Sequence, residues 1–349
     1  MDLHLLNPLL DKRWADFVAY HPRASVFHEP GWLEALARTY GYQPYVLSNI
    51  GVDEKLVNGV PLCRVGAHLV SLPFSDHCDL LVSGSQEMGD ILDGLRAEVD
   101  RRRFRYIELR PLSDIDLTIW GMKTSQRYWF HELDLTPTLE LLFRRLHKNS
   151  FQRKIRRVER ERLTYEVGAS TQLVEEFYRL LLLTRRRHRL IPQPRLWFSN
   201  LVECMESQVQ IRLVRKNSVP IAAVLTIRHR DTLVYKYGCS DAKFHRLGGM
   251  PYLYWKMIEE GKAEGIARID FGRSDRDNLG LINFKDRLGA ARRLITYCRY
   301  TNANVGQPAE GWLVSRLQHF TRQHAAKFFA GMPDSVLSMA GRALYKYLG

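Results

Sequence analysis

The sequence predicts a mixed α/β (α+β) protein made of two domains that share one order of elements. Each half begins with a helix, continues through a three-stranded meander, and returns through a second helix to two further strands. The length of 349 residues also suits two domains better than one. We therefore expect two central, largely antiparallel twisted sheets flanked by helices.

The domain boundaries follow from this order. The first domain is predicted over 1–136, with helices at 30–40 and 86–103 and strands at 45–50, 56–65, 68–72, 106–110 and 128–135. The second is predicted over 169–302, with helices at 171–189, 194–205 and 251–264 and strands at 209–215, 219–228, 232–239, 267–271 and 294–300. Residues 137–168 form the connection, including one long basic helix over 138–162. Residues 303–349 are expected to form C-terminal helices that pack on the first domain or lie on a membrane surface.

The composition indicates an anionic partner. The formal net charge is +14, which favours tRNA, coenzyme A, a nucleotide-linked substrate or an acidic membrane surface, and no DNA is expected. The chain shows no signal peptide and no apolar run of about 20 residues. We therefore predict a cytoplasmic protein, with peripheral contact at the inner face of the membrane as an option. The five cysteines are widely spaced without a Cys-x-x-Cys pair, so neither a disulfide framework nor a metal site is indicated.

The stretch from Asp270 to Ala290 carries the strongest chemical signal. Gly, Ser, Asp, Arg and Asn residues follow an apolar run, which is typical of a polar loop at a strand end. Lys285 in this stretch could place a positive charge against an oxyanion or a phosphate. Asp270 could orient Lys285 or accept a proton from an amine, and Arg273 is a candidate anion ligand. The alternative is an exposed loop with Phe284 as a core residue and Asp270 as a capping carboxylate.

The order helix, meander, helix, strand pair resembles the GNAT acyltransferase fold. That fold binds a pyrophosphate on a glycine-rich loop before a helix. The corresponding candidates are Arg246, Gly248 and Gly249, although Pro251 replaces a small residue and removes an amide donor. The alternative is an ordinary helix start with proline in its first turn.

The paired halves, the basic segment Lys148–Arg157 and the Gly280–Lys285 motif together resemble the FemAB-type aminoacyltransferases and their acyltransferase relatives. The resemblance implies transfer of an acyl or aminoacyl group to an amine in peptidoglycan, exopolysaccharide or other cell-envelope metabolism. It implies that Lys285 stabilises the oxyanion, that Phe284 shapes its pocket, and that Arg187, in Thr184–Arg187, clamps an anion.

The same resemblance leaves the substrates open. The donor is expected to be aminoacyl-tRNA or acyl-CoA, with no permanently bound cofactor. The acceptor is expected to be an amine-bearing envelope precursor or a polysaccharide or lipid intermediate. A non-catalytic module that binds tRNA, another polyanion or a membrane is the rival hypothesis.

Two further pairs of residues are candidates. Tyr235 and Tyr237 alternate along one predicted strand, so they could line an acyl channel from one face of the sheet, or belong to the core. Asp76 and His77 lie in a loop of the first half and could take a proton from the acceptor amine, because histidine titrates in the right range. A structural role for this loop is the alternative.

Overall fold

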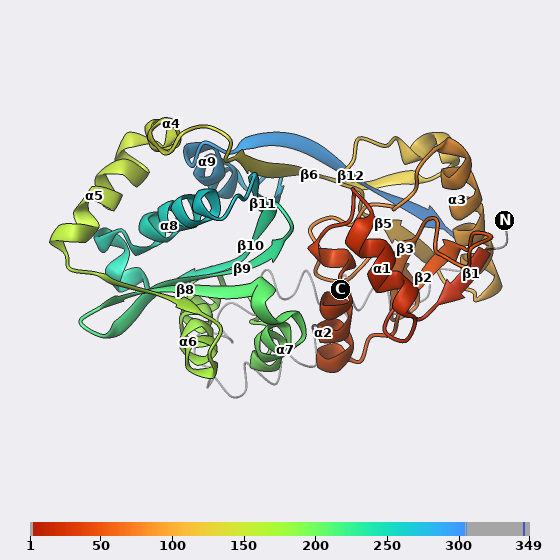
Figure 1. Cartoon of the computed structure of the whole chain (residues 1–349), viewed down its shortest axis with the longest axis horizontal. Helices are drawn as coiled ribbons and strands as arrows, with labels where there is room; N and C mark the ends of the chain where they lie inside the picture. Colours follow the sequence, from red (N-terminus) through yellow and green to blue (C-terminus); the bar gives the residue numbers. More distant parts are fainter. Residues whose placement is uncertain (1–2, 304, 306–344, 346–349) are drawn as a thin grey trace. The chain divides into compact units, whose positions relative to one another are not determined.

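The computed structural model describes residues 3–303, 305 and 345, which form two compact units (Figure 1). Unit 1 contains residues 3–127, 295–303, 305 and 345, and unit 2 contains residues 128–294. Apart from positions 303, 305 and 345, the predicted C-terminal helices over 303–349 lie outside the described residues.

Unit 2 is built on a sheet in the order β6-β11-β10-β9-β8-β7. Its strands are β6 (Lys123–Asp134), β7 (Thr164–Gly168), β8 (Val209–Lys216), β9 (Val219–His229), β10 (Thr232–Ser240) and β11 (Arg268–Asp275). Only β10 and β11 are parallel neighbours in this unit. Helices α5 (Arg153–Arg160), α8 (Gly249–Ala263) and α9 (Leu279–Arg287) cover one face, and α6 (Thr171–His188) and α7 (Arg195–Met205) cover the other (Figure 1).

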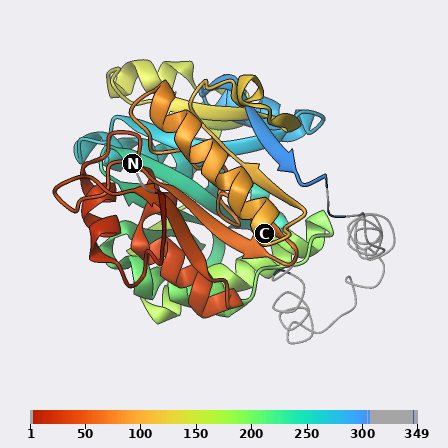
Figure 2. The same cartoon turned by 90° about the vertical axis from the view of Figure 1, so that its right-hand side faces the viewer.

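Unit 1 repeats this plan in the order β1-β2-β3-β4-β5-β12. Its strands are β1 (Leu3–Leu6), β2 (Pro44–Asn49), β3 (Val60–Val65), β4 (His68–Val70), β5 (Tyr106–Leu109) and the C-terminal part of β12 (Ala291–Thr301). Again one pair, β4 and β5, is parallel. Helix α3 (Ser85–Arg101), orange in Figure 2, lies across the sheet and buries Ile91, Leu92 and Leu95 in the core. Helices α1 (Lys12–Tyr20) and α2 (Pro30–Tyr40) complete the unit.

The strand that closes each sheet comes from the other half of the sequence. In unit 2, Phe130 of β6 pairs with Arg273 of β11, and in unit 1, Cys298 of β12 pairs with Leu109 of β5. The sequence had assigned 128–135 to the first half and 294–300 to the second. Periodicity identifies both as strands, but it carries no information about which distant strand each one pairs with.

The mixed α/β class with a helix-flanked, mostly antiparallel sheet is confirmed, as is the predicted helix at Pro30–Tyr40. The single basic helix over 138–162 is wrong. The segment contains α4 (Leu139–Arg145), a π-helical turn at Lys148–Gln152, and then α5. Leu146 and His147 adopt extended backbone between the first two pieces, which ends α4.

The predicted loop from Asp270 to Ala290 is also largely wrong. Strand β11 continues to Asp275, and α9 begins after Asn278, whose side chain accepts a hydrogen bond from the Leu281 amide. Asn278 is a good N-cap residue, and it was mistaken for a loop residue because it stands among other polar side chains. The buried positions of α9, Ile282 and Lys285, are three residues apart as one helix face requires.

Candidate active site

The candidate site of unit 2 lies where the two parallel strands separate. β10 and β11 pair only from Thr232 with Arg268 to Val234 with Asp270. Beyond that point β10 stays paired with β9, while β11 stays paired with β6. Both strands carry a bulge just after they diverge. Where parallel strands separate, backbone groups lose their partner strand and side chains pack between the two strands.

Aromatic side chains fill the space between the separating strands. The hydroxyl of Tyr254, on α8, donates to that of Tyr235, on β10, at 2.8 Å. Burial raises the pKa of Tyr235 to about 12, so both phenols are neutral at physiological pH. A Cβ on Gly238 would stand 1.8 Å from the Tyr235 hydroxyl, so only glycine leaves room for this ring. The rings of Phe271 and Phe284 complete the cluster.

Tyr235 and Tyr237 do not share a face of β10, contrary to the sequence prediction. Tyr235 packs toward α8, whereas the Tyr237 hydroxyl accepts a hydrogen bond from the Trp197 indole of α7 at 2.9 Å. The reason is the bulge between Tyr235 and Tyr237, which shifts the register and breaks the two-residue alternation. Only Tyr235 lies beside the separating strands.

Lys285 is buried rather than solvated. It is 4% exposed, and its ammonium donates to the carbonyls of Gly272 and Arg273, both at 3.1 Å. The Asp270 carboxylate accepts from the Gly272 amide at 2.6 Å and so caps the same bulge. The Arg273 guanidinium lies 4.2 Å from the centre of the Tyr128 ring. The structure therefore brings Lys285, Phe284, Asp270 and the Arg273 backbone together at one point of β11.

His131 is a buried residue at this bulge that the sequence analysis missed. On β6 it stands between Phe130 and Glu132, which pair with Arg273 and Asp270, so it faces the bulge. It is fully buried, and neither ring nitrogen has a hydrogen-bond partner among the described residues. Its Nε2 lies 3.4 Å from Asp286 Oδ1. A lone histidine in an alternating strand gave no signal, because only the pairing of β6 with β11 brings it here.

His131 makes the stability of the chain sensitive to acid. Burial, and then the positive charge of Lys285, lowers the pKa of His131 to about 4, against the ordinary value of about 6.5. The neutral ring thus stabilises the folded state above about pH 6.5, and that stabilisation is lost as pH falls toward 4. Between pH 7 and pH 4.5, we expect the free energy of unfolding of the wild type to fall by about 2 kcal/mol more than that of His131→Phe. Urea unfolding at the two pH values measures this difference. Equal losses would contradict this account of His131.

A second group of basic side chains lies at the end of β10. The Arg187 guanidinium donates to the Ser240 carbonyl at 3.0 Å, and Thr184 Oγ1 accepts from the Ser240 amide at 2.9 Å. Ser240 Oγ lies 2.9 Å from His245 Nε2. Burial, followed by the charges of Arg187 and Lys154, lowers the pKa of His245. These groups create a positive potential at the start of α8, which suits an anion.

The glycine-rich loop beside this basic group is covered by α5. Gly248 has a φ of +83°, and a Cβ there would stand 2.9 Å from Lys154 Cβ and 3.0 Å from the Lys154 carbonyl oxygen. The Arg157 guanidinium also donates to the Arg246 carbonyl, at 3.4 Å. Gly249 packs on Ala222. The two glycines are therefore explained by close packing of protein on both sides.

The predicted pair Asp76 and His77 belongs to unit 1. The Asp76 carbonyl accepts from the Tyr297 hydroxyl at 2.6 Å. His77 is 4% exposed and meets the Phe27 ring edge-on at 5.1 Å. Local contacts of unit 1 therefore hold both residues.

The described residues contain neither a metal-binding cluster nor a membrane-spanning helix. No group of three His, Cys, Asp or Glu side chains there could hold a metal ion. In the same residues, no helix is long and apolar enough to cross a membrane.

Comparison with known proteins agrees with this geometry. Residues 145–285 match the family model described as an acetyltransferase (GNAT) domain. The solved structure of FemX is similar at a TM-score of 0.68 and 14% identity, covering 86% of this chain and 98% of FemX. The C-terminal domain of a candidate lysylphosphatidylglycerol synthetase from Agrobacterium fabrum is similar at a TM-score of 0.55 and 15% identity, covering 84% and 92%.

A tandem GNAT protein from the clavulanic acid biosynthesis pathway is also similar, at a TM-score of 0.50 and 10% identity, covering 88% of this chain and 100% of that protein. No curated protein matched the sequence. Residues 145–285 therefore match a GNAT acyltransferase domain. The chain as a whole has a fold similar to that of FemX and of the tandem GNAT protein, with two GNAT-like halves.

Proposed function

We propose that the protein transfers an acyl or aminoacyl group to an amine of a cell-envelope precursor. The observation that carries this proposal is the Lys285 ammonium, fixed at the β11 bulge where β10 and β11 separate. In the proposed step, the acceptor amine attacks the acyl carbonyl and generates a tetrahedral oxyanion. Lys285 stabilises the negative charge, and the intermediate collapses with loss of the donor's hydroxyl or thiol and of one amine proton. No protein nucleophile is required.

The acceptor is proposed from the neighbours in fold. FemX and the candidate lysylphosphatidylglycerol synthetase resemble this chain over more than four fifths of its length. The second name describes attachment of lysine to a lipid headgroup. We propose an amine-bearing envelope precursor as the acceptor, reached from the inner face of the membrane, to which a net charge of +14 would be attracted.

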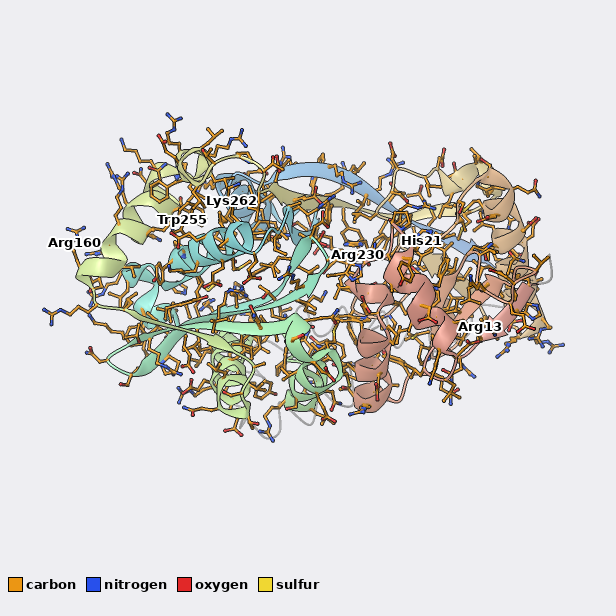
Figure 3. All side chains as sticks on the ribbon, in the orientation of Figure 1. Arg13, His21, Arg160, Arg230, Trp255 and Lys262 are labelled. Carbon is orange, nitrogen blue, oxygen red and sulfur yellow. The ribbon has the colours of Figure 1, made fainter. Side chains whose placement is uncertain are left out.

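Aminoacyl-tRNA is the donor we favour over acyl-CoA. This preference rests on α5, which packs so closely on the glycine-rich loop that a Cβ on Gly248 would stand 3.0 Å from the Lys154 carbonyl oxygen. The outer face of α5 instead exposes Arg153, Arg156, Arg157 and Arg160, and Figure 3 shows Arg160 projecting outward. Guanidinium groups in a row suit a phosphodiester backbone better than a single cofactor.

The experiment is a binding titration of the full chain with charged tRNA and with acetyl-CoA. We expect tRNA binding that weakens with salt, and no saturable binding of acetyl-CoA up to about 1 mM. The logarithm of the tRNA binding constant should fall linearly with the logarithm of the salt concentration. Replacing the four α5 arginines by glutamine should reduce the magnitude of this slope by about 3, because each lost phosphate contact removes about 0.7–0.9.

Replacement of Arg101, Arg102 and Arg103 by glutamine is the control, since these residues form an exposed basic cluster in unit 1. It should leave the salt slope unchanged. Saturable binding of acetyl-CoA, with no binding of tRNA at any salt concentration, would instead identify an acyl-CoA-dependent GNAT enzyme. The family match and the name of the tandem relative also allow this outcome.

A further inference from the structure

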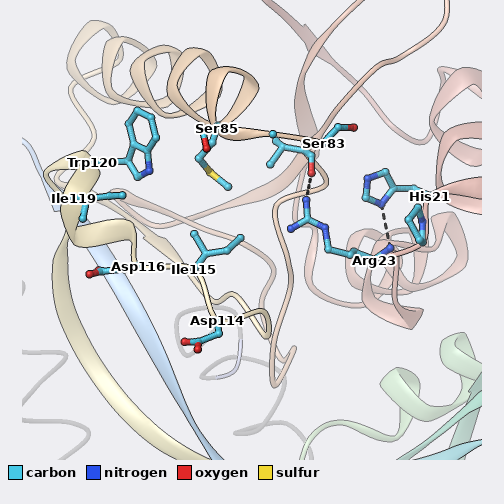
Figure 4. A pocket seen from close by; sticks show the side chains of 13 residues that line it. His21, Arg23, Ser83, Ser85, Asp114, Ile115, Asp116, Ile119 and Trp120 are labelled. Carbon is cyan, nitrogen blue, oxygen red and sulfur yellow. Dashed lines mark hydrogen bonds between the residues drawn. The ribbon is translucent and has the colours of Figure 1, made fainter.

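Unit 1 contains an open pocket that has no part in the proposed transfer chemistry. Its volume is about 690 Å³, within the range of small-molecule sites. Figure 4 shows it between the start of α3, the segment around Arg23, and the segment from Asp114 to Trp120. All of its lining residues belong to unit 1, whereas Lys285 and Arg187 belong to unit 2.

One wall of the pocket is apolar and held in place by local structure. Ile119 and Trp120 lie on a short 3-10 helix, Leu117–Trp120, whose first turn is capped by Asp116. The Trp120 ring rests on α3 at Gly89, where a Cβ would come within 3.0 Å of it. Ile119 is nevertheless 75% exposed. A fixed, exposed aliphatic and aromatic wall favours a ligand with an apolar body.

Groups of opposite charge complete the lining. The Asp114 carboxylate has no hydrogen-bond or ion-pair partner among the residues that the structure describes. Asp116 adds a second negative charge on the same side. Arg23 is oriented from the other side, because its guanidinium donates to the Val82 carbonyl and its amide donates to His21 Nδ1 at 3.2 Å (Figure 4).

We infer that this pocket binds an amino acid or short peptide, whose ammonium pairs with Asp114 and whose carboxylate pairs with Arg23. The apolar side chain of the ligand lies on Ile119 and Trp120. Asp114 is exposed, so a neutral apolar ligand would displace water from its carboxylate without pairing the charge, and a purely anionic ligand would be repelled by Asp114 and Asp116. A zwitterion with an apolar body matches all three parts of the lining.

Calorimetric titration of the full chain with the dipeptide Leu-Leu tests this inference. We expect saturable binding with Kd of about 1 mM or tighter. N-acetyl-Leu-Leu and Leu-Leu amide should each bind about tenfold more weakly to wild type. Asp114→Asn should weaken Leu-Leu about tenfold and show no further loss with N-acetyl-Leu-Leu, because the same ion pair has already been removed.

Asp90→Asn is the control, because Asp90 is an exposed carboxylate on α3 that does not line the pocket. This variant should bind Leu-Leu as the wild type does. Binding that is insensitive to both Asp114→Asn and N-acetylation would overturn the inference. The inference would also be overturned if calorimetry detects no binding of Leu-Leu, or of the dipeptides Ala-Lys and Ala-Glu, at about 10 mM. Lys285→Ala should retain dipeptide binding, so that failure of the transfer reaction and failure of this site can be distinguished.

Discussion

Lys285→Ala is expected to lower the rate of acyl transfer by about 10²–10³, the usual effect of removing one group that stabilises an oxyanion. It should also destabilise unit 2 by about 1–3 kcal/mol, because the carbonyls of Gly272 and Arg273 lose their buried donor. If Lys285 lay in a polar surface loop, as its sequence context suggested, the substitution would lower activity with little loss of stability. Burial of the side chain changes that expectation.

Lys262 supplies a matched control for Lys285→Ala. Its ammonium also donates to two carbonyls, those of Leu135 at 2.8 Å and Thr136 at 3.1 Å, but this interaction is nearer the surface. Lys262→Ala should cost less than about 1 kcal/mol and leave transfer unchanged. The measurements are single-turnover transfer rates and urea unfolding. A Lys285→Ala variant that is folded and transfers at the wild-type rate would eliminate the proposed role of Lys285.

Arg212→Met is expected to destabilise unit 2 by about 3 kcal/mol or more. The Arg212 side chain is 2% exposed, and its three nitrogens donate to Glu260 at 2.8 Å, Thr226 at 2.6 Å and Gln210 at 2.9 Å. Glu260 also accepts from the Tyr165 hydroxyl at 2.6 Å. Removing the cation leaves the Glu260 carboxylate partly buried without its charge partner.

Urea unfolding of two comparison variants tests the reason for this loss. Arg228→Met removes an exposed ion pair between Arg228 on β9 and Glu264 at the C-terminal end of α8, and it should cost less than about 1 kcal/mol. Adding Glu260→Gln to Arg212→Met should recover part of the lost stability, because the unpaired charge is then absent. If Glu260→Gln lowers the stability of Arg212→Met by as much as it lowers that of the wild type, the two side chains do not act as a pair.

Several elements could be predicted from the sequence because their signal is local. The helix at Pro30–Tyr40 ends at Gly41, and the meander of unit 2 consists of apolar runs separated by short polar turns, so these local signals were sufficient. The polar context after an apolar run suggested Lys285 as a candidate, whereas Arg187 was suggested only by the resemblance to the FemAB-type family. Local signals failed at α9, where Asn278 looked like part of a loop although it caps a helix.

The relative positions of the candidate site residues depend on tertiary contacts. The bulge after Tyr235 places Tyr237 on the opposite face, and the pairing of β6 with β11 brings His131 to the bulge that holds Lys285. Helix α5 packs against Gly248 in the predicted pyrophosphate loop. Bulges, strand partners and helix packing depend on contacts between residues far apart in the chain. Local periodicity does not specify those contacts. Candidate residues could therefore be predicted from the sequence, but their arrangement could not.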